Sequence, residues 1–520
     1  NPAHEQALGK MAAAAYPDLA VSLSSEVCPE WREFERFTTT TINAFTQPMF
    51  DRYLRRLETG LKELGFGGRL FVMSSSGGTL TPETARRFPS RVIESGPAAG
   101  AQMSAFHGRA LKQTELLSFD MGGTTAKGAL IRGGAAIKVY HQEVARIHDF
   151  KAGSGLPVKS PVIDMIEIGA GGGSIAGVDV RGTIQVGPTS AGADPGPACY
   201  GQGGTAATLT DANLVLGYLD PKFFLGGEMS LDREASEQVI RDNIAAPLKL
   251  SLARAAWGIH EIVDEDVARA FRIHASERGF DYRGSSMIAF GGSGPVHAMG
   301  VARKLGIPRV IFPVAAGVMS ALGLLASPLT FEVARTRQVF VDDLTAADFA
   351  ATLAALESDA MAPLVQAKVE TGGLNISRRL DMRYHGQGHE IEVTLPQDAK
   401  IEALARIFRG HYTAVHGAAL LDAPLVITTW KVEVSAPPPA LASAPPKAQS
   451  KAAPKAARLA YFGEDYIETP VYDRQDLGIG AIIDGPALIE ERESTAIIGP
   501  GDRVQVDEHG NLIAELVRLS

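Results

Sequence analysis

A glycine pair and two threonines follow an apolar run in residues 116–127, LLSFDMGGTTAK. Gly122 and Gly123 would let the backbone turn tightly and bring its N–H groups against phosphate oxygens, while the hydroxyls of Thr124 and Thr125 would add hydrogen-bond donors. The pattern therefore predicts a loop that binds a polyphosphate. An ordinary hairpin with a glycine turn would use the same residues, so this stretch alone leaves both alternatives open.

Two charged residues flank this loop. Asp120 would lie beside the phosphates, where a carboxylate holds Mg²⁺ through water or orients a nucleophile. Lys127 would offset phosphate charge. If the loop binds a nucleotide, we expect catalytic roles for Asp120, Thr124 and Lys127.

Two further glycine loops have compatible chemistry. Residues 164–174, DMIEIGAGGGS, place Asp164 and Glu167 before a glycine run, where their carboxylates either serve an anion-binding loop or hydrogen-bond to its amides. Residues 290–298, FGGSGPVHA, leave bare backbone on which a flat ring or a ribose would fit, and their proline suits the first turn of the next helix. His297 follows this turn and is a candidate to face a ligand.

The other metal-binding residue types give weaker patterns. His385 and His389 are four residues apart in an alternating segment that indicates a strand, which would place both on one face as a surface pair or a metal pair. No third ligand is evident. Cys28 and Cys199 lie far apart, which argues against a disulfide framework and a cysteine-based zinc site, so we expect structural roles for both.

Short apolar strands precede polar turns with a glycine pair three times, in residues 69–78, 114–131 and 284–306. This repetition predicts several strands of one α/β layer that present loops at one edge, where open α/β sheets bind ligands. Apolar residues at helical spacing predict an amphipathic helix within residues 30–64 and further helices over residues 231–244 and 259–277. The glycine-rich residues 169–204 are expected to form tight loops.

Bulk composition excludes several classes of protein. The 520 residues are 45% hydrophobic, enough for several cores, and the net charge of −9 without a long basic run argues against a nucleic-acid partner. Residues 310–331 are uncharged over a membrane-spanning length, but their prolines and glycines predict a buried strand, a glycine loop and a short helix. The first residues show neither a starting Met nor a signal pattern. We expect a cytoplasmic chain without a membrane partner.

Taken in order, seven motifs resemble those of the hydantoinase A and 5-oxoprolinase family. They are VIESGPAAGA, FDMGGTTAK, DMIEIGAGGGSIA, VGPTSAGADPGPACYGQGGTAATLTDANLVLGYLDP, ERGFDYR, FGGSGPVHA and GVMSALGLLASP. The similarity runs over nearly the whole chain, and such an ordered set is far more specific than any single loop.

The resemblance implies an α/β fold of the actin-like ATPase type, with ribonuclease-H-like halves and a C-terminal β-rich module. It also implies ATP-dependent opening of a hydantoin, 5-oxoproline or another lactam, with ATP and Mg²⁺ or Mn²⁺ as cofactors and a B-type partner subunit in a hetero-oligomer. Close relatives instead carboxylate acetone or acetophenone. Ile166 keeps that alternative open, because hydantoinase-like members often carry His there. A third alternative is a non-catalytic, nucleotide-binding structural subunit.

By resemblance, all three glycine loops would line one nucleotide cleft, and Asp120 and Asp164 would hold the metal ion. The expected ATP-binding residues are Gly122, Gly123, Thr124, Thr125, Gly171, Gly172, Gly173, Ser174, Gly291, Gly292, Ser293 and Gly294.

The expected organisation has five parts. Residues 1–110 would be the remainder of a first actin-like half with connecting helices, residues 111–335 the second ribonuclease-H-like half, and residues 336–434 an α+β domain. A proline- and alanine-rich linker at residues 435–458 would lead to a small β-rich module at residues 459–520. The family usually opens with a domain that carries a first Asp-x-Gly-Gly-Thr loop. None precedes residue 116, so we expect the chain to lack that domain and to hold ATP from one side.

Overall fold

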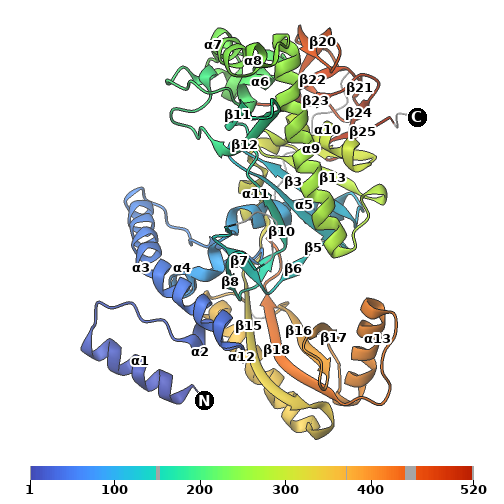
Figure 1. The fold of residues 1–520 in the computed structure, drawn as a ribbon. Coiled ribbons are helices and arrows are strands. Elements are labelled where there is room, and N and C mark those ends of the chain that lie inside the picture. Colours follow the sequence, from blue (N-terminus) through green and yellow to red (C-terminus); the bar gives the residue numbers. More distant parts are fainter. Residues whose placement is uncertain (1, 148–152, 371, 440–451, 518–520) are drawn as a thin grey trace. The chain divides into compact units, whose positions relative to one another are not determined.

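The computed structural model describes residues 2–147, 153–370, 372–439 and 452–517. It divides into two compact units, each built from three separate segments of the chain. Unit 1 comprises Asn1–Ala98, Lys138–Val162 and Ala326–Ala440, and unit 2 comprises Ala99–Ile137, Ile163–Leu325 and Leu441–Ser520. Figure 1 traces the chain through these segments.

Unit 2 is built on a nine-stranded sheet with the order β10-β4-β3-β13-β14-β25-β24-β21, in which β5 also pairs with β4. Strands β3 (Leu116–Met121), β4 (Ala126–Arg132) and β10 (Met165–Ile168) form an antiparallel meander, and β13 (Ser286–Phe290) and β14 (Arg309–Phe312) continue it in parallel with β3. This is the strand order of the expected ribonuclease-H-like half. The α/β fold class is confirmed, including the β-rich C-terminal region.

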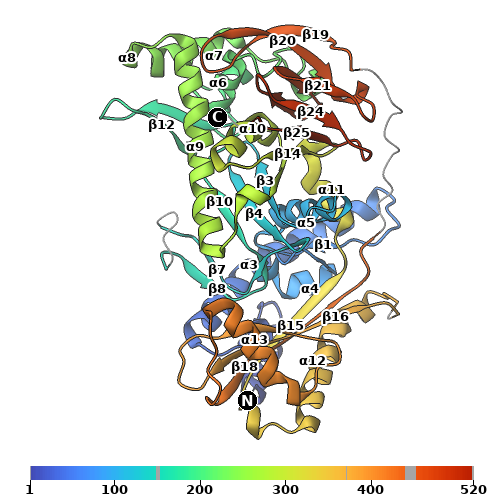
Figure 2. The same ribbon diagram turned by 90° about the vertical axis from the view of Figure 1, so that its right-hand side faces the viewer.

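Helices cover both faces of this sheet (Figure 2). Phe119 of β3 packs edge-on against Phe271 of α9 (Leu252–Arg278), with ring centroids 5.6 Å apart. The neighbouring Ser118 shares a hydrogen bond of 2.8 Å with Ser104 of α5 (Ser95–Ala110). Because successive side chains of a strand point to opposite faces, α9 and α5 lie on opposite sides of the sheet.

The strands after residue 455 divide between two sheets of unit 2. Strand β25 (Leu512–Glu515) pairs with β14 and, through β24 (Arg503–Val506), extends the nine-stranded sheet to β21 (Ile482–Asp484). The remaining strands form a four-stranded sheet: β19 (Ala456–Tyr461), β20 (Tyr466–Asp473), β22 (Ala487–Glu490) and β23 (Thr495–Ile498). The C-terminal strands therefore belong to the same hydrophobic core as β3 and β13.

Unit 1 contains a four-stranded antiparallel sheet with the order β15-β18-β16-β17. Its strands are β15 (Thr330–Phe340), β16 (Asn375–Tyr384), β17 (Ile391–Leu395) and β18 (Leu425–Ser435). Helix α12 (Ala346–Gln366) packs on β15 and β18, and α13 (Leu404–His416) packs on β17. Trp430, Tyr384 and Phe408 are fully buried in its core.

The remaining helices and strands are short apart from α1 and the long α3. They are α1 (Ala3–Ala15), α2 (Ser24–Val27), α3 (Glu33–Glu63), α4 (Pro82–Arg87), α6 (Leu209–Val215), α7 (Arg233–Ile240), α8 (Ala246–Leu248), α10 (Gly294–Leu305), α11 (Met319–Ala326), β1 (Val72–Met73), β2 (Thr79–Leu80), β5 (Ala135–Ala136), β6 (Lys138–Val139), β7 (Gln142–Val144), β8 (Leu156–Val158), β9 (Val162–Ile163), β11 (Ser174–Val178) and β12 (Ile184–Ser190).

The predicted helices are present with shifted bounds. Helix α3 fills the range predicted within residues 30–64, but Phe37, Phe45 and Met49 of its apolar side are 60%, 80% and 62% exposed. Helix α9 ends where predicted, at Gly279 in the left-handed conformation, and begins seven residues earlier than expected. The turn that starts α9 is capped by Ser251, whose hydroxyl accepts from the backbone N–H of Arg254.

Two expectations about strands need correction. Of the three strands that precede polar turns, β3 and β13 are neighbours in one sheet, but β1 pairs with β2 in a separate two-stranded sheet of unit 1. Residues 169–204 contain a hairpin of β11 and β12 in addition to tight turns. Local sequence predicts that a strand forms, but the sheet that it joins depends on distant segments.

The uncharged segment at residues 310–331 folds as predicted, into β14, a 3₁₀ turn at Ala316–Val318 and α11. Among the described residues, no helix is both long and apolar enough to cross a membrane. Half of the linker predicted at residues 435–458 lies outside the described residues, while Ser435 ends β18 and Ala456 begins β19.

Candidate functional site

The predicted phosphate loop is the turn between β3 and β4. Asp120, the residue before the last of β3, lies opposite Lys127 of β4, and the N–H of Gly122 donates to the carbonyl oxygen of Thr125 at 3.1 Å. A Cβ atom at Gly122 or Gly123 would meet no atom within 4 Å. The backbone on this side of the turn is therefore open to an approaching molecule.

Asp120 is held at the base of this turn. The hydroxyl of Ser320 donates to its Oδ2 at 3.3 Å. A Cβ at Gly291 would lie 2.6 Å from Asp120 Oδ1 and 2.4 Å from the carbonyl oxygen of Met121, and Gly291 has φ +85°, so this close approach requires glycine. Burial raises the pKa of Asp120 to about 6, against the hydrogen bond from Ser320 and the charge of Lys127.

The GAGGGS loop packs directly on the first loop. The N–H groups of Gly172 and Gly173 donate to the carbonyl oxygens of Gly122 and Gly123, at 3.0 and 2.6 Å. A Cβ at Gly171 would lie 2.5 Å from the backbone nitrogen of Thr124, which only glycine avoids. These two amides therefore support the first loop.

The third loop, Gly291 to Gly294, contacts both of the other glycine loops. Its Ser293 N–H donates to the carbonyl oxygen of Met121 at 2.9 Å, and a Cβ at Gly172 would lie 3.0 Å from the hydroxyl of Ser293. Each glycine loop thus contacts the other two within unit 2. The sequence predicted that these loops share one site, and the structure brings them together around Asp120.

A pocket lies beside the third loop, at Gly292. Its walls are Leu219, Asp220, Phe223, Phe224, Leu225 and residues Glu490 to Thr495. Aromatic rings and carboxylates lie here beside bare glycine backbone, but the cavity measures only about 30 Å³, too little for a nucleoside.

Two of the predicted site residues have other partners. Lys127 forms an ion pair of 3.2 Å with Glu167, its neighbour on β10. Both oxygens of Asp164 accept from the guanidinium of Arg278, with 3.1 Å between Arg278 Nη2 and Asp164 Oδ1. A metal role for Asp164 stays a prediction, and it would require Arg278 to move away. His297 of α10 does not face a ligand, because it is fully buried and its ring contacts Asp264 of α9.

The other candidate ligands are separate from the glycine loops. His385 and His389 lie in the turn between β16 and β17, so the prediction that both stand on one strand is wrong. Cys28 and Cys199 are free and buried, and burial raises the pKa of the Cys28 thiol to about 11, as befits a packing role.

Among the described residues, one group has the spacing of a metal site, namely His260, Asp264 and His297, whose ligand atoms lie within 4.8 Å of one another.

Sequence reasoning did not single out Ser320 or Thr210. Ser320 contacts Asp120, and both the hydroxyl and the N–H of Thr210 donate to the carbonyl oxygen of Gly172 at 2.8 Å. Ser320 belongs to the motif GVMSALGLLASP, and Thr210 precedes the buried Asp211. The sequence signal for Ser320 was its position as a polar residue within this apolar motif.

Comparison with known proteins settles the family. The model for hydantoinase/oxoprolinase matches residues 36–333, and the model for the hydantoinase/oxoprolinase C-terminal domain matches residues 342–514. The chain belongs to the hydantoinase/oxoprolinase family. The resemblance of the seven motifs is thereby confirmed.

Three curated relatives cover nearly the whole chain. An uncharacterized protein of Methanocaldococcus jannaschii is 36% identical over 99% of this chain and 75% of its own length. The caprolactamase subunit alpha of Pseudomonas jessenii is 33% identical over 98% of the chain and 73% of its own. The acetophenone carboxylase gamma subunit of Aromatoleum aromaticum is 30% identical, over 99% and 72%.

Two solved structures share the fold. The ATP-dependent caprolactamase from Pseudomonas jessenii aligns with a TM-score of 0.81 and 32% identity, covering 99% of this chain and 75% of that one. Acetone carboxylase in its nucleotide-free state aligns with a TM-score of 0.80 and 26% identity, with the same coverage. This family member thus resembles both hydrolases of cyclic amides and ketone carboxylases.

Proposed function

We propose that this chain is the ATP-binding subunit of an ATP-dependent hydrolase of cyclic amides. The observation that carries the proposal is the meeting of three glycine loops around Asp120. The 33% identity to a caprolactamase subunit supports a lactam as the substrate class. Relatives named as subunits of larger enzymes support a B-type partner in a hetero-oligomer.

In this proposal the first loop holds the phosphates of ATP. The open backbone at Gly122 and Gly123 would donate to phosphate oxygens, and Thr124 and Thr125 would add their hydroxyls. Gly171, Gly172, Gly173 and Ser174 would act from behind, by fixing the first loop. The backbone from Gly291 to Gly294 would face the nucleoside.

Asp120 fits a role beside Mg²⁺ because its carboxyl group lies at the loop and receives a hydrogen bond from a neutral hydroxyl. Asp164 fits less well, because both its oxygens are engaged by Arg278. When bound, Mg²⁺ would neutralise charge on the phosphates. Lys127 would add positive charge near the loop.

The substrate explains the need for ATP. An unstrained amide carbonyl is a poor electrophile with a poor leaving group, and transfer of a phosphoryl group to its oxygen makes it reactive toward water. Such a step depends on positioning and on electrostatic stabilisation of the moving phosphoryl group. Three loops joined by hydrogen bonds and close contacts suit this task, because their donors are already in position where charge develops.

The decisive variant is Asp120→Asn, assayed with the partner subunit. We expect ATP hydrolysis to fall by about 100-fold or more, the scale of losing a key electrostatic group, with an unchanged melting temperature. Asp266→Asn, a change at a partly exposed position of α9 outside the three loops, is the matched control. Full ATP hydrolysis by Asp120→Asn would remove Asp120 from the mechanism.

A ketone carboxylase subunit is the second candidate, favoured by Ile166 and by the 30% identity to an acetophenone carboxylase subunit. Phosphate release with hydantoin, 5-oxoproline or caprolactam in the absence of bicarbonate supports the hydrolase. Release that requires both a ketone and bicarbonate would instead establish the carboxylase. A third candidate, a non-catalytic nucleotide-binding subunit, predicts ATP binding by calorimetry without turnover on either substrate class.

A further inference from the structure

Four polar side chains form a closed ring in the core of unit 2. They are Asn213 of α6, His260 and Asp264 of α9, and His297 of α10, and each is at most 5% exposed. The contacts run from His297 Nδ1 to Asp264 Oδ1 (2.7 Å), from Asp264 Oδ2 to His260 Nε2 (3.5 Å), from His260 Nδ1 to Asn213 Oδ1 (2.9 Å), and from Asn213 Nδ2 to His297 Nε2 (3.2 Å).

Asn213 fixes the protonation of both histidines. An amide offers donors on its nitrogen and an acceptor on its oxygen, so the imidazole facing the nitrogen must accept and the imidazole facing the oxygen must donate. A neutral imidazole carries one N–H. One histidine therefore points its N–H at Asp264 and the other points a lone pair at it, whichever way the amide of Asn213 is turned.

Asp264 consequently meets a donor on one oxygen and a lone pair on the other. With the amide as placed, His297 donates to Oδ1, while Oδ2 faces the lone pair of His260 and has no hydrogen-bond partner among the described residues. An ionised carboxylate would leave two acceptors opposed. A proton on Oδ2 turns this contact into an O–H donor facing a nitrogen acceptor and satisfies every member of the ring.

We propose that this ring holds one proton on the Asp264 carboxyl group and, as a positioning unit, fixes the second and third glycine loops relative to each other.

The surroundings favour the neutral form. Around Asp264, α9 contributes Glu261 and Glu265, and α10 contributes Lys304, whose ammonium is engaged by Glu261 at 2.9 Å. Burial raises the pKa of Asp264 to about 7 and lowers the pKa of His260 and of His297 to about 3. The rings of Trp257 and Tyr218 pack on His260 and exclude water from that side.

The ring lies one helical turn behind two of the glycine loops. Asn213 follows Thr210 by three residues, and Thr210 holds the carbonyl oxygen of Gly172. His297 follows Gly294 by three residues at the start of α10. The ring joins α6, α9 and α10, and it therefore sets the distance between the second and third glycine loops. The importance of that distance rests on the proposed function.

A metal ion is the competing occupant, since His260, Asp264 and His297 have suitable spacing. A metal bound to both histidines would leave each with an N–H directed at Asn213. The amide nitrogen of Asn213 would then face a donor in the core. A proton leaves no such conflict.

The test compares Asp264→Asn with Asp264→Ala in the full chain. Asparagine reproduces a protonated aspartate, with an oxygen for the N–H of one histidine and an N–H for the lone pair of the other. We expect Asp264→Asn to keep the wild-type melting temperature at pH 5 and to exceed it at pH 8, where the wild-type carboxyl group ionises. Asp264→Ala should melt several degrees lower at both pH values.

Asp211 of α6 is the matched control, a buried aspartate whose oxygens meet only donors. They accept from the N–H groups of Ala198, Cys199 and Thr208 and from the hydroxyls of Thr208 and Ser236. Asp211→Asn places an amide N–H₂ against these donors, so it should lower the melting temperature at every pH.

The second measurement is the affinity for ATP, determined by calorimetry. We expect Asp264→Asn to bind ATP about as tightly as the wild type and Asp264→Ala to bind it more weakly. The proposal is overturned if Asp264→Asn melts as low as Asp264→Ala, or if elemental analysis of the wild-type protein finds a stoichiometric metal ion that Asp264→Asn loses. If the wild-type chain binds no ATP but Asp264→Asn keeps its pH-dependent gain in melting temperature, the proposed function fails and the proton ring stands.

Discussion

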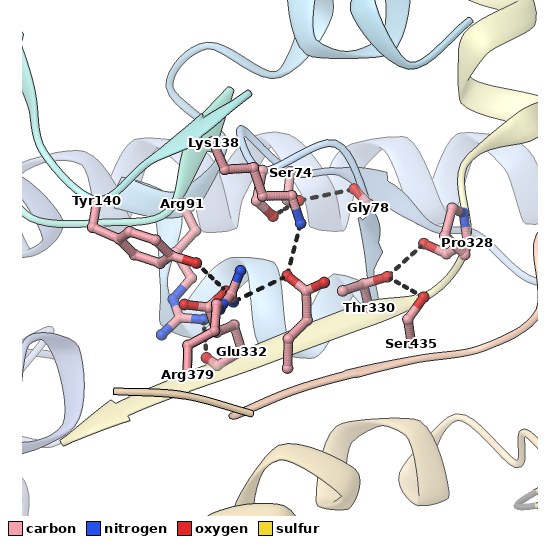
Figure 3. A network of polar contacts seen from close by, with 12 residues as sticks. Ser74, Gly78, Arg91, Lys138, Tyr140, Pro328, Thr330, Glu332, Arg379 and Ser435 are labelled. Atoms are coloured by element: carbon pink, nitrogen blue, oxygen red, sulfur yellow. Dashed lines mark hydrogen bonds and ion pairs between the residues drawn. The ribbon is translucent and has the colours of Figure 1, made fainter. Parts of the chain in front are cut away.

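Each unit buries a cluster of polar side chains that includes carboxyl groups, and the two clusters differ in how the charge of those groups is compensated. In unit 1 an ionic cluster of Lys138, Glu332, Arg379, Lys431 and Glu433 lies on and beside strands β15, β16 and β18. Figure 3 shows Lys138, Glu332 and Arg379 of this cluster. In unit 2 the ring around Asp264 has no cation within its four members. Burying an unpaired charge is costly, so the first cluster is balanced by opposite charges and the second by a proton.

The ionic cluster follows from strand register. Glu332 of β15 stands opposite Glu433 of β18, and Arg379 of β16 stands opposite Lys431 of β18, so each directly paired set has like charges. Such pairs are destabilising by themselves. Arg379 relieves them by reaching Glu332 at 2.6 Å, and Lys138 reaches Glu433 at 2.7 Å.

Tyr140 shows how closely these charges are packed. Its hydroxyl donates to Glu332 at 3.2 Å, and its ring lies 3.8 Å from the ammonium of Lys431. Burial opposes ionisation in both clusters, but Lys138 and Arg379 together lower the pKa of Glu433, whereas Glu332 keeps a raised pKa although Arg379 reaches it. Around Asp264 the near neighbours are histidines, which burial keeps neutral.

The largest expected effect is loss of the cation in unit 1. Arg379→Met should lower the free energy of unfolding of unit 1 by about 3–5 kcal/mol, because Glu332 and Glu433 then face each other without it. Hydrogen exchange with mass spectrometry resolves this unit separately. Adding Glu332→Gln should recover part of the loss, and a loss below about 1 kcal/mol for Arg379→Met would contradict the charge-paired description.

A smaller effect is expected from crowding the ring in unit 2. A Cβ at Gly300 would lie 2.0 Å from Asp264 Oδ2, so Gly300→Ala should cost about 1–3 kcal/mol in unfolding free energy. Gly410→Ala in α13 is the control, because its Cβ would meet no atom within 4 Å. That change should stabilise by up to about 1 kcal/mol. Equal stabilisation by both would show that α10 does not press on Asp264.

The smallest effect is a difference in pH dependence between the two clusters. In unit 1, burial raises the pKa of Glu332 to about 7 and of Asp381 to about 6. These groups bind protons more tightly when folded, so the stability that they contribute is complete near pH 4 and is lost as the pH rises through 6 and 7. Acidification from pH 7 to pH 5 should therefore stabilise β15 and β16.

In unit 2 the sign is reversed. Burial lowers the pKa of His260 and His297 to about 3 and of His107 to about 4, so their contribution is present above pH 6.5 and is lost as the pH falls. The pKa of His274 is lowered as well. Carboxyl groups with raised pKa values act the other way, namely Asp120, Asp264, Asp266 and Glu491. The pKa shifts of His260 and His297, from 6.5 to about 3, are the largest among these groups. Exchange rates corrected for intrinsic pH dependence should show α9 loosening on acidification, and parallel responses of α9 and β15 would contradict the contrast.

The sequence alone predicted the elements that carry the glycine loops, because each depends on local chemistry. The apolar run before Asp120 makes a strand, Gly279 ends α9, and Pro295 lies in the first turn of α10. The order of the motifs also predicted the family. The register that places Glu332 opposite Glu433 was not predictable, because it joins strands that are 101 residues apart along the chain.

What the sequence determined by itself, then, is the set of glycine loops, the helices around them and the family, since backbone freedom and hydrophobic period are local properties. Only the tertiary structure decided which groups meet. In it the N–H groups of Gly172 and Gly173 bond to carbonyl oxygens of the first loop, Asp164 accepts from Arg278, and His297 contacts Asp264. These contacts join segments far apart in the chain, and burial then fixed the charge that each group carries.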